Sequence, residues 1–477
     1  MHRISRSLAG LVIGAASASA VPARADEVAS HAIHAALAPV RAANTAAVVT
    51  AANAFLATLD AAQLAETEYP FTLSNAEHWS NLPGVTRNGP SLGPESAMGT
   101  TAGAGTAPGG TGGTPPTGSG MGGPPAGGGS FGGGATVTLP TFTMNDAQRA
   151  AALALAQAAL SRVGFATLQK VRAADDVLGA TGTPGYGSGN YHVAILGTPS
   201  ATAPWMLQVG GHHLAYNITY NAAQVSATPV FLGAEPPNFS VLSDGTTVVT
   251  GTVDGSTRYF VNGQATATAP DGEVSATVAP LEAQRSAVYN LLQLVQADLN
   301  VASAAKLDQS FDDVTLGATA STGNDTNYPF NAATETAQLY PTGTTGRGVL
   351  FTALNPQEQL ATLAAIAAWV RTQKGDIATE LLLNYVSPDA LAQTYVAYSP
   401  GQGGTADFGP NPLQQASPVS AAGSYFRIDG PRVWIEAVVQ QAIVYRAENW
   451  VHYHTLWRDK TADYGACFSS GADAPAC

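Results

Sequence analysis

Two histidines separated by one residue lie near the C-terminal end of the chain, within segment 450–459. This segment is rich in aromatic and β-branched residues, which is typical of a strand. Side chains alternate along a strand, so His452 and His454 should share one face, about 7 Å apart. Two imidazoles at this spacing can bind one metal ion if another strand supplies a third ligand. Arg458 continues the same face, whereas Asp459 takes the other.

The best candidates for a third ligand are two adjacent histidines, His212 and His213, which follow two glycines. Adjacent residues of a strand face opposite ways, so at most one of them joins a given site unless a bulge at the glycines re-aims the chain. His192, in the strand-like segment 191–196, is a further candidate ligand. We therefore expect a histidine-ligated metal site, without a choice between His212 and His213.

Such a site predicts a divalent metal, most simply zinc, although copper or iron fits the same ligands because imidazole discriminates weakly. Zinc with an open position acidifies a bound water, which is the chemistry of a hydrolase. A carboxylate would accept the water's proton, and an arginine could bind a carboxylate or an oxyanion of the substrate. The candidate catalytic groups are Glu235, Glu436, Arg432, Arg458 and Asp459, and we expect Arg432 and Glu436 to share a face of their strand.

Other functions remain open on the same residues. The histidines could form a metal-free acid–base pocket or serve the fold alone. A non-catalytic binding protein for a small molecule or glycan is the alternative to an enzyme, and an assembly protein of the envelope is a third possibility. Aromatic residues could line the cleft of such a binding protein, or they could simply pack the core. They are Tyr191, Trp205, Tyr216, Trp434, Trp450 and Trp457.

The first 25 residues resemble a secretory signal peptide. Arg3 and Arg6 precede a short apolar run, Leu8–Ala20, and the small residues of Ala23–Ala25 suit cleavage. The run is too short and too rich in alanine to span a bilayer comfortably, although an anchor that stays attached is the alternative. We expect the mature protein in the periplasm or secreted, with no later membrane span.

The chain is acidic, with a formal net charge of −13 at pH 7. Removal of Arg3, Arg6 and Arg24 leaves 17 of the 20 basic residues against 33 acidic ones. This balance argues against nucleic acid or an anionic membrane as the main partner, favours solubility and could help to recruit cations. The partner that we expect is a small-molecule substrate or ligand. Nothing in the composition indicates the oligomeric state.

The only cysteines, Cys467 and Cys477, both lie in the C-terminal tail. An exported chain usually closes such a pair into a disulfide, and two free thiols are the alternative.

Composition divides the chain into a signal peptide (1–25), an N-terminal helical segment of the main domain (26–88), an insertion (89–136), the main domain (137–465) and a tail (466–477). The insertion is dominated by Gly, Pro, Thr and Ser. It cannot bury enough apolar surface to offset the entropy of ordering, so we expect disorder.

Hydrophobic periodicity within the main domain predicts first a helix, then strands, then helices and then strands. The predicted helices are 143–171, 281–306, 357–374 and 377–385, with a further one from Pro388; the predicted strands are 191–196, 205–209, 213–220, 229–232, 246–252, 257–261, 273–278, 424–428, 432–439 and 450–458. This order predicts an α+β fold with a mixed or largely antiparallel sheet and flanking helices.

Several separated motifs resemble the bacterial exported protein family catalogued as domain of unknown function 3500. They are Asn81-Leu82-Pro83 with Arg87 and Gly89, Asn190-Tyr191-His192 through Gly197-Thr198-Pro199, Gly211-His212-His213-Leu214, Phe231-Leu232-Gly233-Ala234-Glu235-Pro236, and His452-x-His454-x-x-Trp457-Arg458-Asp459 followed by Tyr464-Gly465. The resemblance covers most of the mature chain and implies no particular activity.

Overall fold

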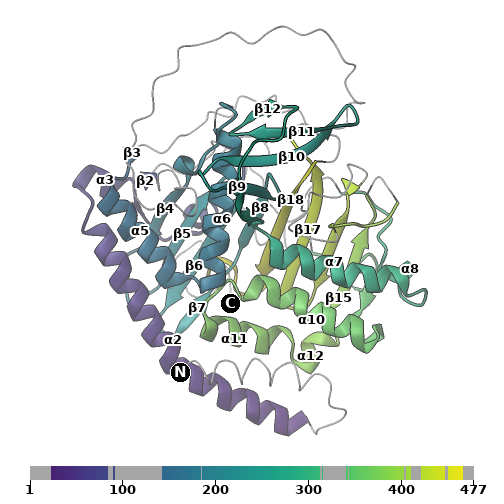
Figure 1. Ribbon diagram of the computed structural model, residues 1–477. Helices are drawn as coiled ribbons and strands as arrows, with labels where there is room; N and C mark the ends of the chain where they lie inside the picture. Colours follow the sequence, from purple (N-terminus) through teal and green to yellow (C-terminus); the bar gives the residue numbers. More distant parts are fainter. Residues whose placement is uncertain are drawn as a thin grey trace.

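The structure is a computed structural model that describes residues 23–83, 90–91, 142–183, 185–311, 314, 340–341, 343–401, 404–409, 421–445 and 450–465. The expected signal peptide up to residue 22, the Gly/Pro-rich insertion apart from residues 90–91, and the tail with both cysteines lie outside these residues. The described part confirms the α+β class (Figure 1).

One large sheet forms the centre of the molecule. Its strands, in spatial order, are β14 (Val349–Leu350), β15 (Tyr395–Ser399), β16 (Tyr425–Asp429), β17 (Val433–Gln441), β18 (Val451–Asp459), β8 (Val230–Ala234), β6 (Leu214–Asn221), β5 (Trp205–Gly211), β4 (His192–Leu196), β2 (Pro90–Ser91) and β3 (Phe142–Thr143). β1 (Glu68–Tyr69) pairs with β4, and β7 (Gln224–Ser226) pairs with β6. The pairs β1–β4 and β2–β3 are parallel and the others are antiparallel, as expected for a mixed, largely antiparallel sheet.

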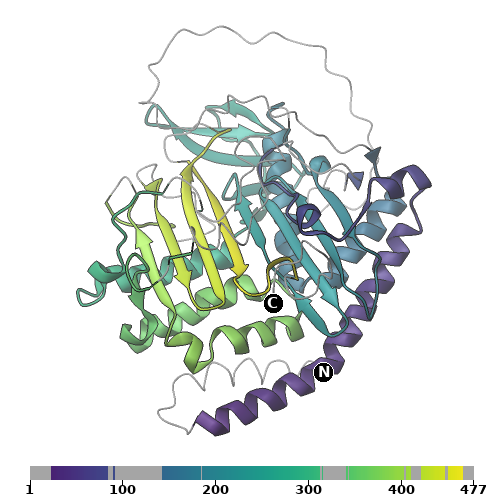
Figure 2. The ribbon, with the colours of Figure 1, turned by 180° about the vertical axis from the view of Figure 1, so that it is seen from behind.

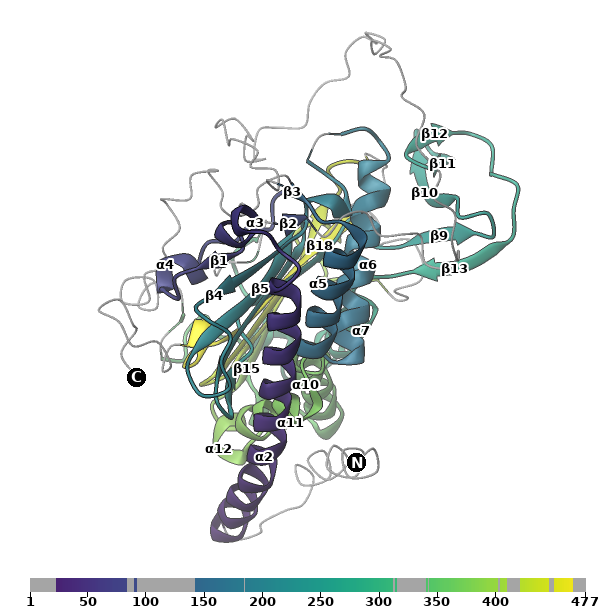
Figure 3. The same ribbon diagram turned by 90° about the vertical axis from the view of Figure 1, so that its left-hand side faces the viewer.

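A smaller sheet stands off one side of the large one (Figure 3). It has the order β12 (Gln264–Thr266), β11 (Ser256–Val261), β10 (Thr247–Val253), β9 (Phe239–Leu242) and β13 (Val274–Val278). Aromatic contacts tie it to the chain just before β18, because the ring of Phe260 packs against Tyr445 at 4.8 Å and against Trp450 at 5.9 Å. The Trp450 indole also donates a hydrogen bond to the Thr250 carbonyl.

Helices cover one face of the large sheet (Figures 1 and 3). They are α2 (Ala23–Leu56), α5 (Asp146–Ala159), α6 (Arg162–Gly179), α7 (Glu282–Ala297), α10 (Pro356–Val370) and α11 (Gly375–Tyr385), with the short α3 (Ala61–Ala65), α8 (Ala302–Ala305) and α12 (Pro388–Leu391). The largest hydrophobic core lies between these helices and the sheet. None of the described helices combines the length and the apolar character that crossing a bilayer requires.

An N-terminal segment crosses the other face of the sheet (Figure 2). It begins with α4 (Leu73–Ala76) and runs on to residue 83. The ring of Trp79 lies 6.3 Å from that of Phe231 on β8, and its indole donates a hydrogen bond to the Tyr464 hydroxyl. A second core cluster fills this side. Both faces of the sheet are therefore buried, and polar side chains on the second face lie in an apolar setting.

Two predicted helices are interrupted. The predicted helix 143–171 ends at Ala159, because Leu160 is extended and the Ser161 side chain caps a new helix, α6. The predicted helix 281–306 ends at Ala297, where Asp298 turns the chain and its carboxylate accepts the Asn300 backbone N–H. A side-chain cap at Ser161 and a local side-chain turn at Asp298 therefore override a continuous apolar pattern.

The two halves of the large sheet meet at β8 and β18. These strands pair antiparallel, with His454 opposite Gly233 and Leu456 opposite Phe231. On the helical face, the Thr455 hydroxyl accepts a hydrogen bond from the Trp369 indole of α10 and donates one to the Leu232 carbonyl. A single hydroxyl therefore links the helix layer to both central strands.

Replacing Thr455 with valine should lower the free energy of unfolding by ~1–3 kcal/mol, because the buried Trp369 indole N–H loses its acceptor. Urea unfolding of the purified variant would measure this loss. Thr257 is exposed on β11, and its replacement with valine should change the value by less than ~0.5 kcal/mol. Equal stability of the two variants would contradict the linking role of Thr455.

Candidate metal centre

The two C-terminal histidines share one face of β18, as the alternation predicted. His454 lies opposite Gly233 of β8, and its ring contacts Phe231 on the same face at 5.2 Å. The His452 and His454 rings lie 4.8 Å apart. Thr455 follows His454 and lies on the opposite face of the strand, where its hydroxyl accepts a hydrogen bond from the Trp369 indole of the helix layer.

His213 reaches the same place from the turn between β5 and β6. Gly211 and Leu214 are the last paired residues of this hairpin, so His212 and His213 form its two-residue turn. The backbone of His213 has a φ of 60°, a left-handed conformation that histidine adopts more readily than most residues. Its N–H donates to the Asn81 carbonyl at 3.1 Å, and its carbonyl accepts the Gly233 N–H at 2.7 Å. The turn is therefore fixed on both sides.

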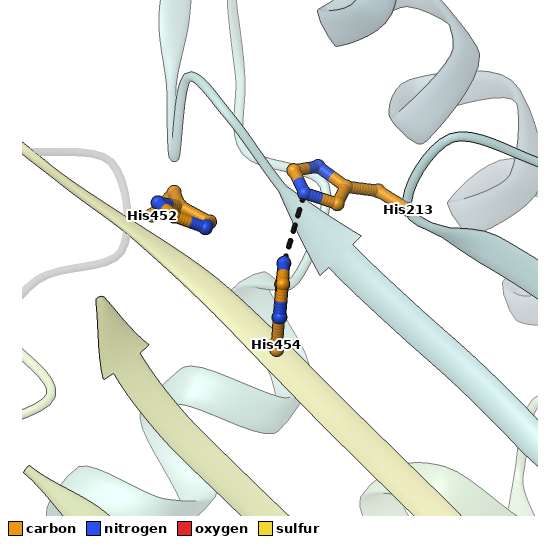
Figure 4. Close-up of side chains that lie close together, drawn as sticks. All are labelled: His213, His452 and His454. Atoms are coloured by element: carbon orange, nitrogen blue, oxygen red, sulfur yellow. Dashed lines mark hydrogen bonds between the residues drawn. The ribbon is translucent and has the colours of Figure 1, made fainter. Parts of the chain in front are cut away.

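The three rings converge on one point (Figure 4). The Nε2 atoms of His213 and His454 are 3.1 Å apart, and the ligand atoms of His213, His452 and His454 all lie within 4.8 Å of one another. Two nitrogens on one tetrahedral zinc, each at 2.0–2.1 Å, would be roughly 3.3 Å apart. The described residues therefore contain a group of three histidines that could hold a metal ion.

A backbone carbonyl of the neighbouring strand β17 orients the His452 ring. Its Nδ1 lies 2.9 Å from the Gln441 carbonyl oxygen, which can only accept, so Nδ1 carries the hydrogen. The lone pair is then on Nε2, which is buried and has no hydrogen-bond partner among the described residues. This is the arrangement in which a metal-binding histidine is usually held.

Burial keeps two of the imidazoles neutral. It lowers the pKa of His213 and of His452 well below 6.5, and the neighbouring imidazoles lower both values further. A protonated imidazole has no lone pair for a metal, so a lowered pKa favours the ligating form.

Gly233 makes room for the His213 ring. A Cβ atom built on Gly233 would lie 2.8 Å from the Cδ2 and Cγ atoms of His213 and 2.9 Å from the Tyr453 carbonyl oxygen. Both distances are shorter than real Cβ contacts. The absence of a side chain at this position is therefore what allows His213 to approach β18.

His212 does not join the three ligands but supports one of them. Its ring stacks on that of His213 with centroids 3.7 Å apart, and its Nδ1 lies 2.6 Å from the Asp175 carboxylate on α6. As expected, only one of the two adjacent histidines joins the group, although they form a turn rather than part of a strand. The other Asp175 oxygen accepts the Gly187 N–H, and the Tyr186 ring packs edge-on against His212.

Glu235 lies next to this group. Its carboxylate accepts the backbone N–H groups of Ile443 and Val444, both at 2.8 Å, in the loop that leads to β18. Burial raises the pKa of Glu235, whereas those amides and the His212 ring lower it. The carboxyl is therefore a buried acid, and it also fixes the loop beside the histidines.

The structure places the remaining candidates elsewhere. His192 lies on β4 with its ring against Gly210, and it is not one of the three grouped histidines. The Glu436 carboxylate accepts the Tyr425 hydroxyl at 2.5 Å, and Arg458 pairs with Asp463 at 2.9 Å.

Arg432 and Glu436 do not share a face. Arg432 precedes β17, and its guanidinium pairs at 2.6 Å with Asp459, which also accepts the Tyr385 hydroxyl of α11. Glu436 belongs to the opposite face with Tyr425. The expectation of a shared face was wrong because the strand begins only at Val433.

The six aromatic residues considered for a binding cleft are all fully buried. Tyr191, Tyr216, Trp205 and Trp457 belong to the core beneath the helices, Trp434 to the core on the opposite face, and Trp450 to the core beneath the small sheet. They pack three separate cores and form no common cleft.

Sequence reasoning missed Asp175, Asn81 and Gly233 as parts of this site. No spacing pattern connects them to the histidines, because each contact joins distant segments. For Asn81 and Gly233, the motifs that carry the family resemblance were the only sequence signal.

The buried acid Asp176 gives this region a pH dependence. Burial raises its pKa from 3.8 to about 6, and hydrogen bonds from the Ser188 N–H and hydroxyl oppose the rise. A raised pKa adds stability that is complete below pH 3.8 and is lost as the pH rises through 6. Between pH 4 and 7 the wild type should therefore lose up to about 3 kcal/mol relative to Asp176→Asn, which has no carboxyl to titrate. Urea unfolding of both proteins across this range would show it, and a difference that does not vary with pH would contradict it.

Comparison with known proteins adds a family but no activity. A search of curated proteins and a search of solved structures each found no match. The sequence profile of the family described as "Protein of unknown function (DUF3500)" matches residues 139–466, which include His213, His452 and His454 but not Asn81. The chain therefore belongs to the DUF3500 family.

Proposed function

We propose that this chain is a metal-dependent, hydrolase-like enzyme in which His213, His452 and His454 bind zinc. One observation carries the proposal. Three buried imidazoles from two distant segments bring their ligand atoms within 4.8 Å of one another, and no carboxylate or thiolate of the described residues belongs to the group. Catalytic zinc sites commonly have three protein ligands and leave one position for water or substrate.

The choice of zinc rests on the donor set. Three neutral nitrogen ligands suit zinc, and they also accept copper or iron. Zinc would supply a Lewis acid and a water of lowered pKa. Elemental analysis and electron paramagnetic resonance of the native protein would distinguish the three metals.

Around the zinc, this chain's own residues would position ligands and take up a proton. The Asp175 carboxylate holds the His212 ring, which stacks on His213 and so restricts the rotation of that ligand. Glu235 is the better placed of the two proposed proton acceptors, since it lies beside His212 and its pKa is raised. Glu436 is already engaged by Tyr425.

The N-terminal pattern supports a place outside the cytoplasm for this activity. Arg3, Arg6 and the apolar run that follows them are typical of an export signal. A small-molecule substrate is also part of the proposal, since an acidic chain is a poor match for polyanions.

A second candidate function is small-molecule binding without catalysis. A pocket of about 280 Å³ lies beside α2 and α11, on the helical side of the sheet. Two ion pairs contribute to its lining, Arg41 with Glu380 and Arg432 with Asp459. A melting temperature that rises with a ligand but not with metal would favour this function over the first.

Purified wild-type protein should contain about one metal ion per chain, and His454→Ala should contain almost none, because two imidazoles rarely hold zinc without a third ligand. Elemental analysis after dialysis would measure both. His192→Ala is a matched control, since His192 is also a buried strand histidine but lies outside the group. Retention of metal by His454→Ala, or its loss from His192→Ala, would contradict the assignment of the ligands.

Gly233→Ala should weaken metal binding at least tenfold, because its methyl group would displace the His213 ring. A competition titration with a coloured zinc chelator would measure the affinity. Gly189→Ala is the control, because a Cβ there meets nothing within 4 Å. If Gly233→Ala binds zinc as tightly as the control, the close approach of His213 to β18 is not needed for the site.

A further inference from the structure

The Asn81 side chain is a buried amide with no hydrogen-bond partner among the described residues. The residue is only 1% exposed, and neither its Nδ2 nor its Oδ1 is bonded to any described residue. Burying a side-chain amide in this way normally lowers the stability of the folded protein by about 1–3 kcal/mol for each polar group left unpaired. Native proteins leave few such groups, and those that remain call for an explanation.

The fully buried Asn217 shows how a buried asparagine that serves the fold is normally satisfied. Asn217 on β6, which is completely buried, accepts the Gln208 amide at 2.8 Å and donates to the Pro229 carbonyl at 3.0 Å. Asn81 departs from this rule at both ends of its amide. The difference indicates that its partner is not one of the described residues.

The backbone of Asn81 contacts the candidate metal centre. Its backbone carbonyl accepts the N–H of His213, one of the three grouped histidines. The segment around Asn81 is firmly held, since the Gln208 amide donates to the Ala76 carbonyl and the Trp79 indole donates to the Tyr464 hydroxyl. A rigid support of this kind is what a residue that positions a ligand needs.

We propose that the Asn81 amide binds the substrate at the metal centre and that the substrate carries a carboxamide-like group. One free donor and one free acceptor on the same amide are complementary to a ligand with an adjacent acceptor and donor, as in an amide. Nδ2–H donates to the substrate carbonyl, and Oδ1 accepts its N–H. This inference rests on the metal-dependent function proposed above and adds a substrate class to it.

The test uses the full-length protein loaded with Co²⁺, whose visible absorption reports on ligands of the metal. Acetohydroxamate is the probe, because it binds metals through oxygen and carries a carbonyl beside an N–H. Asn81→Leu should bind the probe at least tenfold more weakly than wild type, equivalent to about 1.4 kcal/mol. Cobalt content should remain unchanged. Asn75→Leu is the control, since the Asn75 amide is already bonded to the Pro70 carbonyl in the same segment.

Stability separates a role in binding from a role in the fold. Asn81→Leu should melt at the wild-type temperature or above it, because leucine removes an unpaired buried amide. A lowered melting temperature together with lost cobalt would show that Asn81 supports the structure, and it would overturn the inference. If Asn81→Leu does not fold, Asn81→Asp keeps the shape and should also bind the probe more weakly.

The possible failures are distinguishable. Equal affinity of wild type and Asn81→Leu for acetohydroxamate, with cobalt bound to both, would overturn the role of Asn81 and leave the metal centre standing. A wild-type protein that takes up no cobalt would overturn the metal centre and, with it, this inference.

Discussion

The register between β8 and β18 is the constraint on which the site depends. It sets Gly233 opposite His454, and the same glycine both accommodates the His213 ring and donates its N–H to the His213 carbonyl. A shift of one residue would turn His452 and His454 toward the helices and place a side chain where His213 now lies. The histidines therefore meet because two distant halves of one sheet are joined in a single register.

Burial on both faces of the sheet keeps the imidazoles of His213 and His452 neutral. Helices cover one face and the N-terminal segment crosses the other, so the rings of His213 and His452 lose most of their hydration. Desolvation lowers their pKa and leaves the lone pairs free. The nearby carboxyl groups of Asp175 and Glu235 are held by backbone amides, and a cation bound beside them would be partly balanced in charge.

The local part of this arrangement could be predicted from the sequence. Alternation along a strand was sufficient to place His452 and His454 on one face, because that periodicity depends only on backbone geometry. The choice between His212 and His213 could not be made, since it depends on a two-residue turn with a left-handed residue. The roles of Asp175 and Asn81 could not be predicted from local sequence patterns, for a stronger reason. Their contacts with the histidine turn join segments 37 and 132 residues apart, and no local pattern encodes them.

Three ligands from the described residues would fit the proposed reactive centre better than a purely structural one. A structural zinc site is normally closed by four protein ligands. The adjacent imidazole of His212 would not complete the set, because its Nδ1 is bonded to Asp175 and its ring is stacked on His213. His212 thus supports the ring of His213 and does not join the group of three histidines. A metal bound by the other three would keep a position for a small molecule, beside a segment whose Asn81 amide is bonded to none of the described residues.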